Sequence, residues 1–186
     1  MIQATQLRRG NIVRMSGDLF RVVDFHHLTP GNWRAFVQSR LKNLRTGSII
    51  EHRFRADDLV EKVALDKREM EYLYSDADAH YFMDTESFEQ IQFTSDTLGD
   101  SMQYLVANSK IAVEFHEEAP VGIELPATVE LTVVETEPGM PSATATNVLK
   151  PAKTETGLVV GVPHFISAGE KIRVDTSDGK YVARAG

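Results

Sequence analysis

The feature that most constrains the fold is an alternation of apolar and polar residues at period two, which recurs in short runs along most of the chain. In residues 35–43, for example, Val37 and Leu41 fall on one face of a strand and Arg40 falls on the other. Turn sequences such as Ser-Gly-Asp at 16–18 separate the runs. Short strands joined by tight turns indicate a mainly β protein made of small barrels.

The runs form three units, which we predict to be three domains at residues 1–65, 66–128 and 129–186. The first is a small all-β barrel that ends in a short connection at residues 56–61. The second has strands on both sides of the single helical pattern, residues 96–108, an order typical of an OB-type barrel. The third is another small barrel. The predicted strands cover residues 11–15, 19–26, 35–43 and 49–55, then 66–75, 80–84, 88–93, 111–116 and 121–125, then 129–135, 156–162, 171–175 and 180–184.

Charge is distributed unevenly over these units. Residues 1–65 hold 11 Lys and Arg against 6 Asp and Glu, residues 66–128 hold 3 against 14, and residues 129–186 hold 6 against 7. A basic first unit followed by a strongly acidic second one is typical of a protein that contacts nucleic acid at one end. The acidic middle unit cannot lie along a phosphate backbone without repulsion, so we expect it to face solvent, protein or a gap.

A candidate functional loop connects the strands at 19–26 and 35–43 and reads Leu-Thr-Pro-Gly-Asn-Trp-Arg-Ala-Phe. Its Pro-Gly pair supplies turn chemistry, because proline presets φ and glycine accepts a positive φ. The only tryptophan of the chain then stands beside an arginine, which suits stacking on a base or holding a phosphate. The alternative is a mobile loop whose tryptophan folds back onto its own domain. The candidate contact residues are Pro30, Gly31, Asn32, Trp33 and Arg34.

Strand alternation gathers four cations on one face of the hairpin that follows this loop. If residues 35–43 and 49–55 pair in register, the four form a cationic ladder suited to a phosphate backbone. The alternative is an ordinary solvated sheet face. The four residues are Arg40, Lys42, Arg53 and Arg55.

Composition and motifs exclude several classes of function. The chain has no cysteine, which rules out disulfides and cysteine nucleophiles and fits a reducing cytoplasm. No apolar run approaches the roughly 20 residues that span a bilayer, and the N-terminal residues do not form a secretory signal. The six histidines show no metal-ligand spacing, and no phosphate-binding loop or nucleophile motif is present. We therefore expect no metal, no cofactor and no enzymatic activity.

The aromatic residues of the middle unit are predicted to lie in its core. Neither OB-type unit shows the aromatic platform of an OB-fold that binds single strands. The residues assigned to the core are Tyr72, Tyr74, Tyr81 and Phe82.

Several motifs together resemble the bacterial translation elongation factor P family along the whole chain. The strongest match, residues 150–169, reads Lys-Pro-Ala-x4-Gly-x2-Val-x-Val-Pro-x2-Ile-x2-Gly and fits the family's C-terminal signature at every fixed position. Supporting matches include Lys-Asn-Leu-Arg-Thr-Gly at 42–47, Tyr-Leu-Tyr at 72–74 and Glu-Thr-Glu-Pro-Gly at 135–139. The signature positions include Lys150, Ala152, Gly157, Val162, Pro163 and Gly169.

The resemblance implies a KOW/SH3-like first domain and two OB-like domains in an L-shaped arrangement that mimics tRNA. It implies a monomeric cytoplasmic factor that binds the ribosome between the P and E sites, with rRNA, P-site tRNA and mRNA as partners and without contact to membrane or DNA. The loop would reach toward the peptidyl-transferase centre and steady the peptidyl-tRNA, which would relieve stalls at consecutive prolines. The four cations of the hairpin would contact tRNA or rRNA backbone.

Two loops depart from the family's pattern. The family often reads Pro-Gly-Lys-Gly or Pro-Gly-Arg-Asn at the tip and modifies the basic residue, but Asn32 stands at that position here. Arg34 is therefore expected to supply an unmodified positive charge beside Trp33. The family's Gly-Asp-Thr-Ala loop, linked to contact with the E-site codon, appears here without its acidic residue. The corresponding residues are Ser142, Ala143, Thr144 and Ala145, within a predicted long loop at 136–147.

Two other functions stay open on the sequence alone. An elongation factor P-like paralogue would share the fold, although the retained Pro30-Gly31 and Lys42-Asn43-Leu44 favour the factor itself. A general RNA-binding or chaperone-like β module would bind RNA with a steep salt dependence and would show no preference for ribosomes stalled on proline.

Overall fold

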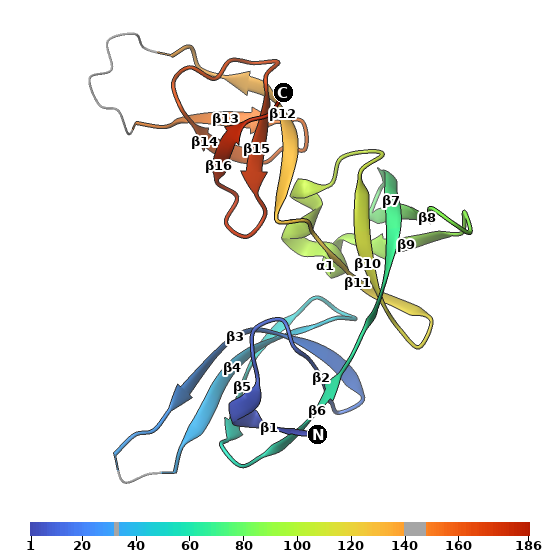
Figure 1. Cartoon of the computed structure of the whole chain (residues 1–186), viewed down its shortest axis with the longest axis vertical. Helices are drawn as coiled ribbons and strands as arrows, with labels where there is room; N and C mark the ends of the chain where they lie inside the picture. Colours follow the sequence, from blue (N-terminus) through green and yellow to red (C-terminus); the bar gives the residue numbers. More distant parts are fainter. Residues whose placement is uncertain (32–33, 140–147) are drawn as a thin grey trace. The chain divides into compact units, whose positions relative to one another are not determined.

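The computed structural model describes residues 1–31, 34–139 and 148–186, and its strands form three sheets (Figure 1). The prediction of a mainly β fold is confirmed. The chain divides into two compact units. The first contains Met1–Arg68, Phe93–Gly99 and Val113–Gly122, and the second contains Glu69–Gln92, Asp100–Ala112 and Ile123–Gly186. The middle sheet contributes residues to both units, and the three-domain boundaries at 65 and 128 stay a prediction.

The first sheet has six strands in the order β1-β6-β2-β3-β4-β5. Its predicted strands are confirmed to within a few residues at their ends, but the predicted connection at residues 56–61 is wrong. Part of it is strand β6, because Val60 is buried and pairs with Ile2 of β1 while the following residues pair with β2. The strands are β1 (Ile2–Gln3), β2 (Ile12–Met15), β3 (Asp18–Leu28), β4 (Phe36–Asn43), β5 (Ile49–Arg55) and β6 (Leu59–Val63), and a 3-10 turn η1 (Ala4–Gln6) follows β1.

The inner face of this sheet forms the core of the first unit, as the alternation predicts. The buried residues of β4 occur at every second position and are Val37, Ser39, Leu41 and Asn43. The hydroxyl of Ser39 donates to the His52 carbonyl (2.8 Å). That hydrogen bond satisfies a polar group that would otherwise be costly to bury. The apolar core consists of Ala4, Leu7, Val13, Phe20, Val22, Val37, Leu41, Phe54 and Val60.

One irregularity in β3 changes which side chains face outward. The register against β4 shifts between Val22 and Asp24, so that Asp24 pairs with the outward Arg40. The following Phe25 then packs against the core. The sequence predicts Asp24 on the face of Phe20 and Val22, and this is wrong because an extra residue in a bulge inverts the alternation beyond it.

The middle sheet has five strands in the order β11-β10-β7-β8-β9, and the continuous helix predicted at 96–108 is wrong. The helix is a single turn, α1 (Ser95–Leu98), in which the Thr94 hydroxyl accepts from the Thr97 N–H (3.3 Å). Gly99, with φ 55°, ends it, and the chain continues as a 3-10 turn, η2 (Gly99–Tyr104). The strands are β7 (Asp66–Asp76), β8 (Ala79–Asp84), β9 (Gln90–Thr94), β10 (Lys110–His116) and β11 (Ala119–Glu124).

The C-terminal sheet has the order β14-β13-β12-β15-β16 and lies within the second unit. The strand predicted at 156–162 is shorter, and an additional strand, β13, precedes it. The sheet's buried core is aliphatic and comprises Leu131, Val133, Ala152, Val160, Val162, Ile166, Ile172 and Val174. The strands are β12 (Thr128–Thr136), β13 (Lys150–Thr154), β14 (Val159–Val162), β15 (Lys171–Asp175) and β16 (Tyr181–Arg184).

Candidate nucleic-acid interface

The four predicted cations share the outward face of the β4–β5 hairpin, which we call the cationic face. Val37 pairs with Phe54 and both are buried, so the residues that alternate with them point away from the core. Arg40, Arg53 and Arg55 are exposed, and Lys42 is half-buried. The four cations that we predict to contact a phosphate backbone therefore lie on one surface of the first unit.

Strand register shows that the cationic face is not a uniform ladder. Arg40 lies between two carboxylates, because it pairs with Asp24 on β3 and with Glu51 on β5. Nearer the tip, Arg53 pairs with Gln38 and Arg55 pairs with Phe36. Opposite charges directly across a ladder attract each other and reduce the field that each presents to a ligand. The two arginines without a carboxylate opposite them in the register, Arg53 and Arg55, therefore lie toward the tip end of the hairpin.

An aromatic contact orients one of the tip-end cations. The Arg53 guanidinium carbon lies 3.5 Å from the centroid of the Phe36 ring. A planar guanidinium held on an aromatic face keeps its N–H groups directed outward at little further cost in side-chain entropy. Arg53 is therefore held by an aromatic contact within its own sheet while it stays exposed.

The tip is carried at the end of the β3–β4 hairpin (Figure 1). Leu28 pairs with Phe36 as the last rung of the ladder. Pro30 and Gly31 are exposed, and Gly31 has φ 44°, in agreement with the turn predicted there. Arg34 is also exposed, while Asn32 and Trp33 lie outside the described residues.

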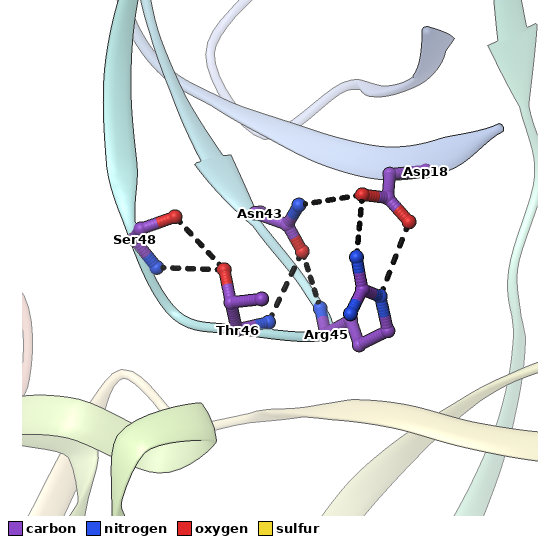
Figure 2. A network of polar contacts seen from close by, with 5 residues as sticks. All are labelled: Asp18, Asn43, Arg45, Thr46 and Ser48. Carbon is purple, nitrogen blue, oxygen red and sulfur yellow. Dashed lines mark hydrogen bonds and ion pairs between the residues drawn. The ribbon is translucent and has the colours of Figure 1, made fainter. Parts of the chain in front are cut away.

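The opposite end of the hairpin is fixed by a polar network (Figure 2). The side-chain oxygen of Asn43 accepts from the N–H groups of Arg45 (2.8 Å) and Thr46 (3.1 Å), and its amide donates to Asp18 (3.0 Å). Arg45 donates to the same carboxylate (2.9 Å), and Thr46 bonds to the Ser48 hydroxyl (2.8 Å). These bonds lower the pKa of Asp18, Arg45 contributing more than Asn43, and they raise the pKa of Arg45. Arg45 is thus engaged within the turn.

A second cation of this sheet is paired inside the first unit. Arg21, which pairs with Lys42 across the ladder, donates to the carboxylate of Glu114 on β10. Glu114 is only 4% exposed and lies between the buried Val113 and Phe115. Sequence reasoning missed this pair, and the signal that would have found it is a carboxylate inside an apolar run, since a buried charge requires a partner.

The residues of the C-terminal signature build a sheet. Ala152 and Val162 are buried in the core, and the Pro163 carbonyl accepts from the Ile166 N–H (3.2 Å). Lys150 donates to the Glu137 carbonyl (2.5 Å). Gly157 and Gly169 have φ 90° and 91°, a conformation that favours glycine. The signature identifies the fold of this segment, and none of these side chains points to chemistry.

Three further predictions concern the codon loop, metal binding and membrane spans. Ser142, Ala143 and Thr144 lie outside the described residues. Among the residues that the structure describes, no group of three His, Asp or Glu side chains is placed to hold a metal ion. In the same part of the chain, no helix is long and apolar enough to cross a membrane.

Comparison with known proteins accounts for the whole chain. Family models described as the elongation factor P KOW-like domain, OB domain and C-terminal domain match residues 3–60, 65–123 and 129–184. Elongation factor P of Acidobacterium capsulatum is 58% identical over 184 residues, which cover 99% of each chain. Elongation factor P of Moorella thermoacetica is 47% identical over 185 residues, which cover 100% of each chain.

Two solved structures were also matched at low identity. Eukaryotic translation initiation factor 5A from Methanococcus jannaschii is 16% identical, with a TM-score of 0.48 over 66% of this chain and 90% of that one. A translation initiation factor eif-5a family protein from Naegleria fowleri is 14% identical, with a TM-score of 0.43 over 67% and 94%. The family assignment rests on the full-length sequence matches: this chain belongs to the elongation factor P family of translation factors.

Proposed function

We propose that this translation factor binds the ribosome between the P and E sites and stimulates peptide bond formation where consecutive prolines stall it. The observation that carries the proposal is the arrangement of the first unit, where a Pro-Gly tip with an exposed arginine extends from a sheet whose outward face is cationic. The family relationship supports a ribosomal site of action.

The tip would act by position rather than by covalent chemistry. Holding the acceptor end of the peptidyl-tRNA in a reactive geometry lowers the entropic part of the barrier to peptide transfer. Asn32 supplies no positive charge, so Arg34 would make the contact with RNA, and Trp33 would stack beside it. The intact mass of the protein from its own host tests whether Arg34 acts without a modification: the mass of the unmodified chain is expected.

The cationic face would contact the phosphate backbone of tRNA or rRNA. Arg53 and Arg55 are the main contacts in this proposal, because Arg40 lies opposite two carboxylates in the ladder, Asp24 and Glu51, which reduce the field that it presents to a phosphate. The C-terminal segment 142–144 lacks the family's acidic residue. In this proposal the segment contacts mRNA through its neutral side chains. The factor would act as a monomer in the cytoplasm.

Reconstituted translation of a template with three consecutive prolines tests the proposal. The double variant Trp33→Ala/Arg34→Ala is expected to lose about threefold or more of the stimulated rate, a cost of about 0.7 kcal/mol or more in the barrier. Arg173→Ala serves as the control, because Arg173 is a surface arginine of the C-terminal sheet that contacts Glu130 (3.4 Å). A template without consecutive prolines should be translated equally fast with either protein.

The outcomes separate the competing functions. Unchanged rates with the double variant would overturn the role of the tip. Stimulation of both templates alike, together with steep salt-dependent binding to free RNA, would instead identify a general RNA-binding module.

A further inference from the structure

Two tyrosines are stacked on the outer face of the β7–β8 hairpin, which lies in the second unit. Tyr74 pairs with Tyr81 across the ladder, and their ring centroids are 4.8 Å apart with an interplanar angle of 30°. Tyr74 is 54% exposed, whereas the neighbouring pair Tyr72 and Phe82 is buried. The prediction that Tyr74 and Tyr81 lie in the core is therefore wrong, since Tyr74 is exposed and the half-buried Tyr81 stacks on it at the outer face. The hairpin presents an aromatic surface.

A break in strand register produces this surface. In a regular strand Tyr72 and Tyr74 would share a face. The register shifts between them, with Tyr72 opposite Phe82 and Tyr74 opposite Tyr81, so Leu73 is an extra residue in β7. Bulges occur where a side chain is re-aimed. Here the bulge turns a tyrosine out of the core and brings it onto the ring of a second tyrosine.

Carboxylates flank the tyrosine pair along the same face. Glu71 pairs with Met83 on one side of the stacked rings, and Asp76 pairs with Ala79 on the other side. These pairs alternate with the inward ones, so both carboxylates share the outer face with Tyr74. The hairpin also lies in the segment 66–128, where 14 acidic residues outnumber 3 basic ones. Such a surface repels a phosphate backbone and attracts cations.

We propose that the outer face of this hairpin is a docking site for an arginine-bearing basic segment of another protein. One guanidinium would stack on the exposed face of Tyr74, and a second would form a bidentate contact with Glu71 or Asp76. Stacking of a guanidinium on an aromatic ring also occurs elsewhere in this molecule. The guanidinium carbon lies 3.5 Å from the ring centroid in the Arg53–Phe36 pair, and the distance is 4.8 Å in the Arg184–Phe165 pair. The proposal goes beyond the proposed function, since it concerns a protein partner.

Fluorescence anisotropy with the full-length chain tests the proposal without a ribosome. The probe is a labelled 12-residue peptide of alternating arginine and serine, with the corresponding lysine peptide and a labelled uridine 12-mer as comparisons. Tyr74→Ser is expected to weaken binding of the arginine peptide about threefold or more, because the cation–π contact with the exposed ring is lost. The lysine peptide should bind more weakly and should lose less, because lysine has no planar fork.

Phe88→Ser is the matched control. Phe88 is a 69% exposed aromatic in the same acidic segment, and its loss should leave peptide affinity unchanged. Equal losses in Tyr74→Ser and Phe88→Ser, or no loss in Tyr74→Ser, would overturn the proposal. A loss of uridine binding instead would identify the surface as an RNA platform. If Tyr74→Ser unfolds, Glu71→Gln/Asp76→Asn must show the same loss.

Discussion

The cationic face of β4–β5 and the signature segment at 150–169 use their residues in opposite ways. Side chains on the cationic face are directed outward, and the pattern that places them is the period-two alternation of any strand with one buried face. The signature segment has the most specific sequence pattern in the chain, yet its alanine and second valine are buried and its glycines occupy turns. The most specific motif thus marks architecture, and the less specific one marks the surface that we propose for binding.

This difference predicts that substitutions in the two regions separate stability from binding. Changes in the signature segment should affect the free energy of unfolding, because they alter packing or backbone conformation. Changes on the cationic face should affect affinity for RNA alone, since exposed side chains away from special features contribute little to stability.

The largest effect is expected for Ile166→Ala in the signature segment. Ile166 is fully buried among Val133, Val162 and Ile172, and truncating such a side chain removes apolar burial and leaves a cavity, at a cost of about 2–5 kcal/mol. Urea unfolding measures it. The neighbouring Phe165→Ala is the control, because Phe165 is 47% exposed and its change should cost clearly less. Equal costs at both positions would contradict the assignment of the segment to the core.

A smaller loss is expected for Gly169→Ala. Gly169 has φ 91°, and its N–H donates to the Val133 carbonyl (2.7 Å), so the backbone cannot relax without losing that bond. An alanine in this region costs about 1–3 kcal/mol. Gly122→Ala is the matched control: its Cβ would meet Glu114 at 3.6 Å, an ordinary contact. Thermal unfolding that shows equal shifts for both variants would contradict the backbone explanation.

The smallest effect on stability is expected for Arg53→Gln/Arg55→Gln, which should change the free energy of unfolding by less than about 0.5 kcal/mol. Ribosome affinity should nevertheless fall. The slope of log affinity against log salt should decrease by about 1.5, because two phosphate contacts are lost. Arg40→Gln should change this slope less than Arg53→Gln or Arg55→Gln alone. The reason is that two carboxylates, Asp24 and Glu51, lie opposite Arg40 in the ladder. A larger change for Arg40→Gln would show that register does not weaken that cation.

Much of the fold could be predicted from periodicity. The strands around Val37 and Phe54 appear where alternation places them, and the buried and exposed sets of β4 are as expected. The errors arise where one residue changes the backbone. Gly99 converts an apparent helix into two short turns, and the bulges in β3 and β7 invert the faces of Asp24 and Tyr74. Periodicity cannot detect a bulge, because the extra residue is specified by the partner strand.

The candidate site was predictable in its residue types but not in its local electrostatics. Arg40 and Arg53 were equivalent in the sequence. Only the structure shows that the first lies opposite carboxylates in the ladder and that the second stacks on an aromatic ring. The Arg21–Glu114 pair joins positions far apart in the chain, which no local pattern connects. Long-range pairing therefore decides which cations are available to a ligand.

The pairing of β1 with β6 has a consequence for the order in which the first sheet forms during synthesis. Within this sheet β1 leaves the ribosome first and β6 leaves last, yet Ile2 pairs with Val60 and Gln3 pairs with Leu59. Closing such a non-local pair is slow compared with closing a hairpin. The nascent chain therefore carries an unpaired edge at β1 until the whole sheet has emerged, and the last strand made completes the ladder that the first began.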